Sequence, residues 1–128
     1  MSYTYDRILE DVGIDDAELR IRYALAENGF GVLTKIDVKA TMKKKIDANI
    51  EPYRILGACN PRMAHKAIGL EPRVGAMLPC NVILREVDSG TEISAIDSVA
   101  SMQAIDNSQL HEVAGEVCDM MREAVDLA

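Results

Sequence analysis

The sequence predicts an α+β fold: a single, mostly antiparallel five-stranded sheet with helices packed on one face. Strand and helix patterns follow the order β-α-β-α-β-α-β-β-α, and the last two strands are joined as a hairpin. The chain has 128 residues, of which 48% are hydrophobic, as expected for one domain with one core. Aromatic residues make up only 4%, so that core must be aliphatic. We therefore expect residues 1–128 to form a single domain.

The first strand is predicted over residues 3–10, at or near an edge of the sheet. A helix follows, with Asp15 as its expected N-cap and Glu18 at the third helical position, the pattern of a capping box. Asn28-Gly29 is expected to end this helix, because glycine tolerates the left-handed conformation that closes a helix. One stripe of the helix is apolar, and it consists of Ala17, Ile21, Ala24 and Leu25.

Two more strand–helix pairs are expected in the middle of the chain. The second strand is predicted over residues 30–38 and the third over residues 53–59. Asn60 is a favourable cap for the helix after the third strand, and Pro61 suits its first position because the missing N–H would be unpaired there anyway. We expect that helix to end near Ile68. The helix between the second and third strands is short and amphipathic, with Ala40, Met42 and Ile46 on one face.

The C-terminal part is predicted as a hairpin followed by a long helix. The strands cover residues 80–87 and 91–97, and Asp88-Ser89-Gly90 forms the turn. Asp106 is the expected cap of the last helix, with Gln109 three residues later. The apolar stripe of this helix is continuous, and it consists of Leu110, Val113, Ala114, Val117, Met121, Ala124 and Val125.

The charges are distributed unevenly along the chain. Residues 35–73 carry 9 basic and 4 acidic side chains, whereas residues 86–128 carry 1 basic and 10 acidic ones, and the whole chain has a net charge of −7. This balance disfavours nucleic acid and membrane surfaces as partners, because affinity for phosphate comes mostly from basic residues. The sequence shows no targeting segment or membrane span, and its three cysteines do not resemble a secreted disulfide framework. We therefore expect a cytoplasmic protein.

The predicted site lies where the third strand ends and the fourth begins. If these strands are antiparallel neighbours, Cys59 and Cys80 meet at the same edge of the sheet. The helix start after Cys59 would stabilise a thiolate and lower its pKa, or bind a small anion or carboxylate. A second thiol within reach could resolve a mixed disulfide or share a persulfide. The candidate ligand-binding residues are Gly57, Ala58, Cys59, Asn60, Pro61, His65, Pro79, Cys80 and Asn81.

Packing is the alternative explanation for both cysteines, because a free cysteine often behaves as a small buried hydrophobe. Packing also explains Cys118, which lies beside the apolar stripe of the last helix. We expect no metal site and no cofactor, since no pair of Cys or His residues has zinc-ligand spacing. His111 is expected to be solvent-exposed. No phosphate loop, nucleophile elbow or dinucleotide fingerprint is present.

An ordered set of short motifs resembles a family of small prokaryotic proteins, domain-of-unknown-function family number 302. The resemblance covers nearly the whole chain, and its motifs are residues 28–34, 36–38, 53–57, 57–61 and 78–80. It implies a fold like that of the TATA-binding protein and a homodimeric state, but no established activity or catalytic residues. Some members resemble this chain in having both cysteines and others lack one or both. Some relatives are encoded beside sulfur-metabolism proteins.

Three functions remain open from the sequence. The first is a homodimeric binding or accessory module with a small-molecule or anion pocket near residues 57–61 and 78–81. The second is a thiol-based sulfur carrier or redox protein that uses Cys59 and Cys80. The third is a structural protein whose dimer surface is itself the function. Whether the protein is an enzyme is left open.

Overall fold

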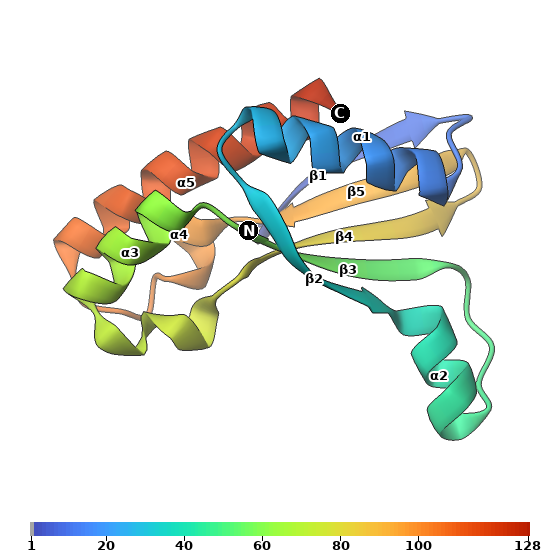
Figure 1. The fold of residues 1–128 in the computed structure, drawn as a ribbon, viewed down its shortest axis with the longest axis horizontal. Helices are drawn as coiled ribbons and strands as arrows, with labels where there is room; N and C mark the ends of the chain where they lie inside the picture. The colour runs from blue at the N-terminus through green and yellow to red at the C-terminus, as the bar shows by residue number, and fades with distance from the viewer. Residues whose placement is uncertain (1) are drawn as a thin grey trace.

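A computed structural model describes residues 2–128 and has the predicted α+β fold (Figure 1). The predicted order of strands and long helices is confirmed. Two short elements, a 3₁₀ helix η1 and a helix α4, were not predicted. The strands are β1 (Thr4–Glu10), β2 (Gly31–Asp37), β3 (Tyr53–Cys59), β4 (Cys80–Val87) and β5 (Gly90–Ile96). The helices are α1 (Ile14–Glu27), α2 (Val38–Ile46), α3 (Pro61–Leu70), η1 (Pro72–Met77), α4 (Ser98–Ser101) and α5 (Ser108–Leu127).

The five strands form one sheet in the order β1-β5-β4-β3-β2, and every neighbouring pair is antiparallel. The first strand is therefore an edge strand, as its sequence indicated, and β2 forms the other edge. The pairing of β2 with β3 is irregular at Leu33, where the register shifts between Val32 and Thr34. This irregularity falls on an edge strand, where bulges are most common.

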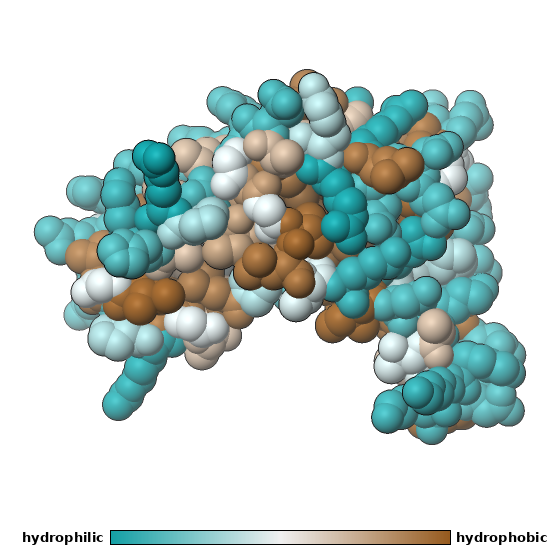
Figure 2. Space-filling model, viewed as in Figure 1, coloured by the Kyte–Doolittle hydropathy of each residue, from teal (hydrophilic) through white to brown (hydrophobic). Residues whose placement is uncertain are grey.

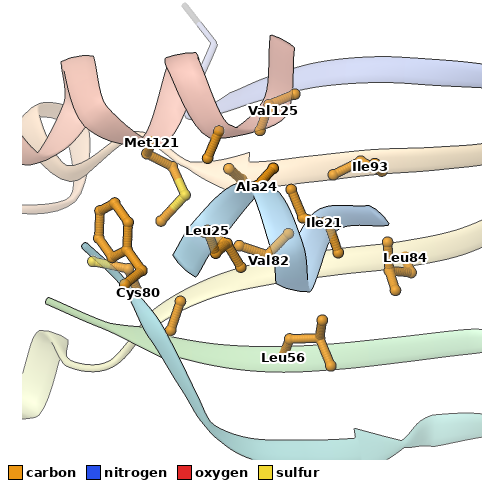
Figure 3. Packing of buried hydrophobic residues seen from close by; sticks show 14 of the residues in the cluster. Ile21, Ala24, Leu25, Leu56, Cys80, Val82, Leu84, Ile93, Met121 and Val125 are labelled. Carbon is orange, nitrogen blue, oxygen red and sulfur yellow. The ribbon is translucent and has the colours of Figure 1, made fainter. Parts of the chain in front are cut away.

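Helices α1 and α5 lie side by side on one face of the sheet and cover its core (Figure 1). The side chains between them are mostly aliphatic, as the composition predicted, and Figure 3 shows several of them between the two helices and the strands. The largest fully buried ones are Ile21, Leu25, Leu56, Leu84, Ile93 and Met121. A second, smaller cluster joins α3 and η1 to the first half of α5, and it contains Ala67, Val74, Met102, Leu110 and Ala114.

The predicted capping box at the start of α1 is wrong. The helix begins two residues earlier than predicted, its N-cap is Gly13, and no side chain caps it. Glu18 instead lies on the buried side of α1. It accepts hydrogen bonds from Arg22 and Arg54, each at 3.0 Å, and it forms an ion pair with Lys35 at 3.0 Å. Burial raises its pKa, but Lys35 and Arg22 outweigh that effect and hold the pKa below its ordinary value. Tertiary ion pairing thus takes the place of local capping.

The predicted cap of the last helix is also displaced by one residue. Asn107, not Asp106, accepts the hydrogen bond from the backbone N–H of Leu110, at 3.0 Å. The amide of Asn107 also donates to the carbonyl of Leu70 at 3.0 Å, so this residue ties the end of α3 to the start of α5. The amide of Asn107 can accept at the cap and donate elsewhere at the same time, whereas the carboxylate of Asp106 can only accept.

Helix α2 projects from the sheet at the β2 edge (Figure 1), and none of its residues is buried. The side chain of Asp37 caps its first turn by accepting from the N–H of Ala40 at 2.9 Å. Its apolar residues face no covering layer, and Ile46 is 69% exposed. The predicted short helix is therefore present, but it is separate from the core.

Candidate functional site

The ends of β3 and β4 meet, as the antiparallel prediction required. Gly57 pairs with Asn81, and Ala58 pairs with Cys80. Cys59 follows Ala58, so the two cysteines are offset by one residue instead of lying directly opposite each other. Side chains alternate between the faces of a strand, so Cys80 shares the helix-covered face with Ala58. All three cysteines are free thiols.

A cavity lies between these strand ends and helices α3, α4 and α5, and we call it the Cys59–Cys80 cavity. Its volume is about 30 Å³, and no charged side chain lines it. A site for one water-sized sphere needs roughly 10–15 Å³, so the cavity has room for a very small ligand. Its lining residues are Phe30, Ala58, Cys59, Asn60, Met63, Ala64, Ala67, Leu78, Pro79, Cys80, Ser98, Met102, Val113, Ala114 and Val117.

Cys80 is the more buried thiol of the pair, with 7% of its surface exposed. Figure 3 shows its side chain at one end of the core, beyond Val82 and Leu84 on the same strand. Its Sγ lies 3.6 Å from the hydroxyl of Ser98. Burial raises the pKa of Cys80, and the nearby Cys59 adds to this, while the hydrogen bond with Ser98 lowers it. The net effect is a raised pKa, so Cys80 is a protonated thiol at neutral pH. Cys59 is half-buried.

Asn60 joins the cavity to helix α3 and acts as the N-cap, as predicted. Its side-chain oxygen accepts from the backbone N–H of Met63 at 3.3 Å, and its Nδ2 donates to the sulfur of Met120 at 3.5 Å. Both partners of the Asn60 side chain are thus methionine residues, one on α3 and one on α5. These contacts use one oxygen lone pair and one N–H, and they hold the amide at the mouth of the cavity.

Gly57 is required by close packing on the face of the sheet away from the helices. A Cβ atom at this position would lie 2.2 Å from Oγ1 of Thr34 and 2.7 Å from Cγ of Pro79. The Pro79 ring therefore rests directly on the backbone of Gly57, one residue before Cys80. This contact fixes the chain that enters β4 and with it the position of the buried thiol.

The structure brings together five of the nine predicted ligand-binding residues around the Cys59–Cys80 cavity: Ala58, Cys59, Asn60, Pro79 and Cys80. The other four do not line it. Gly57 supports Pro79 from outside, while Pro61 and Asn81 are exposed. His65 is exposed and lies in a separate shallow groove between α3 and α5. Met63, Ala64 and Ala67 line the cavity from α3, and His65 lies two residues after Met63, more than half a turn around the helix.

Ten lining residues of the cavity were not predicted as site residues from the sequence, and Met63 and Met102 matter most because they add sulfur atoms. Met63 follows the Asn60 cap at the third helical position, so its inward direction could have been read from the Met63–Ala67 spacing. Met102 and Ser98 belong to α4 and the residue after it, a region with no apolar period long enough to predict a helix. The full set is Phe30, Met63, Ala64, Ala67, Leu78, Ser98, Met102, Val113, Ala114 and Val117.

The remaining titratable residues singled out from the sequence lie elsewhere. Cys118 is buried on α5, and its thiol donates to Oδ1 of Asp97 at 3.5 Å. Burial raises its pKa, and the negative charge of Asp97 adds to the effect. His111 is exposed, with Nε2 lying 2.6 Å from the carbonyl of Ile105. Among residues 2–128, no three His, Cys, Asp or Glu side chains are grouped as metal ligands.

No helix within the described residues combines the length and the apolar character that crossing a membrane would require.

Comparisons with known proteins identify a family but no activity. The family model described as "Domain of unknown function DUF302" matches residues 6–128. The fold is similar to a crystal structure of an uncharacterized conserved protein DUF302 from Bacillus stearothermophilus, with a TM-score of 0.91 and 23% sequence identity. The similarity covers 98% of each chain. The comparison with curated proteins gives no match.

Proposed function

The chain belongs to the DUF302 family of domains of unknown function, and from this premise we propose that it is a binding module whose ligand occupies the Cys59–Cys80 cavity. The observation that supports this proposal is the lining of the cavity, which is apolar and sulfur-bearing and contains no acid or base. Such a lining favours a small, soft or apolar ligand over a free anion, because an anion would lose its hydration without gaining a charged partner.

The test is to fill the cavity and ask whether binding is lost. Xenon is a suitable probe, because it enters dry apolar cavities and shifts the NMR signals of the methyl groups around it. We expect xenon to shift the signals of Met63 and Val117 in the wild-type protein and not in Ala67→Leu, whose larger side chain occupies the space. Ala40→Leu on the exposed helix α2 is the matched control. Equal shifts in all three proteins would contradict the proposal, and Ala64→Leu is a second filling variant if Ala67→Leu does not fold.

The second candidate is a thiol-based sulfur carrier, and it is favoured by the presence of Cys59 and Cys80 on the same cavity. The thiolate of Cys59 would attack a sulfur atom of a polysulfide, form a Cys59 persulfide and release the shorter polysulfide with the electron pair. Cys80, once its thiol has lost its proton to solvent, then attacks the Cys59 sulfur, forms the disulfide and releases hydrosulfide. The oxidant in both steps is the polysulfide.

Site-resolved alkylation distinguishes this carrier from a passive binding module. Iodoacetamide at neutral pH, followed by peptide mass spectrometry, should label Cys59 much faster than Cys80 or Cys118, whose pKa values burial raises. Exposure to polysulfide should add 32 Da to Cys59. Alkylation of Cys59 no faster than that of the urea-unfolded chain, together with no added sulfur, would remove the carrier from consideration.

We also propose that the protein is a homodimer in the cytoplasm. The face of the sheet away from α1 and α5 has no covering layer among residues 2–128, and several large apolar side chains are exposed there. Ile36 on β2 is 48% exposed and Ile8 on β1 is 46% exposed. Figure 2 shows hydrophobic residues along the lower border of the molecule, between α3 and the projecting α2. The three free thiols support a reducing compartment.

Light scattering coupled to size-exclusion chromatography tests the dimer. A mass near twice 14.0 kDa is expected, and Ile36→Glu should shift the protein towards the monomer. A monomeric wild-type protein would remove both the dimer and the function in which the dimer surface alone acts. The net charge of −7 continues to argue against nucleic acid as the partner.

A further inference from the structure

We infer that the Cys59–Cys80 cavity takes a single soft monovalent metal ion, Cu(I), with the sulfur atoms of Cys59, Cys80, Met63 and Met102 as its donors. This inference rests on the proposed binding function, because it names the ligand of that same cavity. The observation behind it is that four sulfur-bearing residues line this one small cavity. The donors come from three separate parts of the sequence, residues 59–63, Cys80 and Met102, so the set does not form a recognisable sequence motif.

The first step is the concentration of sulfur. The chain has three cysteines and seven methionines, and four of these ten residues line a single cavity. Met63 and Met102 are 6% and 4% exposed, so both are held inside the fold rather than at its surface. A fifth sulfur atom, that of Met120, lies 3.5 Å from the amide of Asn60, which also lines the cavity. Apolar packing alone does not need this many sulfur atoms in one place.

The second step is selectivity. Thiolate and thioether sulfur are soft donors that suit Cu(I), zinc and iron–sulfur clusters, whereas hard cations prefer carboxylate, carbonyl or water oxygen. Asn60 and Ser98 provide the only polar side-chain groups besides the thiols, and neither is charged. A structural zinc site would need four Cys or His ligands, and the cavity offers two thiols and no histidine. The donor set therefore fits Cu(I) and excludes the more common cations.

The third step is size and charge. A volume of about 30 Å³ holds one ion and leaves no room for an organic cofactor. Cu(I) enters without a change in oxidation state, and each thiol that coordinates it releases its proton to solvent. A coordinated thiol is deprotonated even where burial otherwise keeps it neutral. The hydroxyl of Ser98, 3.6 Å from Cys80 Sγ, can then donate a hydrogen bond to the metal-bound thiolate.

The test is an anaerobic titration of the reduced protein with Cu(I) in competition with a chromophoric Cu(I) chelator. We expect one Cu(I) per chain and a thiolate-to-copper absorption band in the ultraviolet. X-ray absorption should show sulfur atoms as the ligands of the copper. Cys59→Ser and Cys80→Ser should each weaken binding at least about 100-fold, the upper end of the cost of losing an outer-shell partner. Cys118→Ser is the matched control, because Cys118 is buried but does not line the cavity, and it should bind like the wild type.

The methionine donors have their own pair of variants. Met102→Leu keeps the volume of the side chain and therefore the fold, but it removes one thioether, and it should weaken binding about tenfold. Met77→Leu, at an exposed position, should have no effect. This pair keeps the inference testable if a cysteine variant does not fold.

Failure to withdraw Cu(I) from the chelator would overturn the inference, and so would an equal loss of affinity in Cys118→Ser. If copper fails while xenon still enters the cavity and is excluded by Ala67→Leu, the binding module stands and only its ligand is wrong. If neither enters, both proposals fall.

Discussion

Replacement of Gly57 by alanine isolates one contact on which the geometry of the site depends. Gly57 lies in β3, an interior strand that pairs with β2 through Thr34 and with β4 through Asn81. A new Cβ would lie 2.2 Å from Thr34 Oγ1 and 2.7 Å from Pro79 Cγ, both far inside van der Waals contact. Because the strand is paired on both sides, the backbone of Gly57 cannot move away without breaking ladder hydrogen bonds.

The cost comes mainly from Pro79. The Thr34 side chain is exposed and can rotate to another rotamer, whereas the Pro79 ring is rigid and enters β4 directly. Overpacking of this kind costs about 1–3 kcal/mol, so we expect Gly57→Ala to lower the free energy of unfolding by about 2 kcal/mol. The chain has no Trp, so far-UV circular dichroism in a urea titration is the suitable measurement.

Gly31→Ala is the matched control, because Gly31 lies on the neighbouring strand and a Cβ there meets no atom within 4 Å. It should change stability by no more than roughly 0.5 kcal/mol, as surface substitutions usually do. Thr34→Ala combined with Gly57→Ala should recover little, since the proline contact remains. Equal stability of Gly57→Ala and Gly31→Ala, or full recovery by Thr34→Ala, would refute the assignment of Pro79 as the obstacle.

Two further predictions concern titratable groups. Glu18→Gln should destabilise the fold by about 2–3 kcal/mol, because it leaves the guanidinium of Arg54 with one carboxylate partner fewer in a partly buried site. Since the pKa of Glu18 is held below its ordinary value, wild-type stability should also fall as the pH drops through that lowered pKa, and urea titrations between pH 6 and pH 3 should show less of this loss in the variant. The raised pKa of Cys80 makes stability depend on pH in the opposite direction. Because the thiol ionises at lower pH in the unfolded chain than in the folded one, the free energy of unfolding should fall above about pH 8.5. The fall between pH 8 and pH 10 should be smaller in Cys80→Ala, and an identical fall in both proteins would contradict the burial of that thiol.

The fold was largely predictable because its long elements have clear periods. The apolar stripe from Leu110 to Val125 predicted α5, and the Asn60-Pro61 start predicted α3, with Asn60 as its cap. The antiparallel pairing of β3 with β4 was only a condition of the site prediction, and the mostly antiparallel sheet expected from the C-terminal hairpin favoured it. The two helix signals are local and strong, so tertiary contacts had nothing to override.

The errors arose where a side chain had competing partners. Asp15 and Glu18 have the spacing of a capping box, but Arg54 comes from β3, 36 residues after Glu18, and binds both carboxylates instead. Patterns of neighbouring residues cannot predict an ion pair between side chains that far apart in the sequence. Asp106 and Asn107 are both good N-caps. The carbonyl of Leu70 favours Asn107, because an amide can donate a hydrogen bond to it and a carboxylate cannot.

The candidate site was predicted in part for the same reason. Cys59 and Cys80 were expected to approach because strand order places them together. Met102 directly follows α4, a four-residue helix that is capped by the Asp97 side chain, which accepts from the N–H groups of Val99 and Ala100. One capped turn leaves too short a pattern to recognise, so the thioether donor it carries was not foreseen.

Helix α2 has a consequence for how this fold can vary. Strands β2 and β3 are adjacent and antiparallel, so the segment between them is a hairpin connection, and α2 is an elaboration of that connection which contributes no residue to either core cluster. Its amide protons should therefore exchange with solvent by local opening while those of β3 and α1 remain protected. Shortening the connection to a tight turn would leave the sheet, the covering helices and the cavity intact, so this protrusion is where the chain can lengthen, shrink or acquire a new surface without refolding.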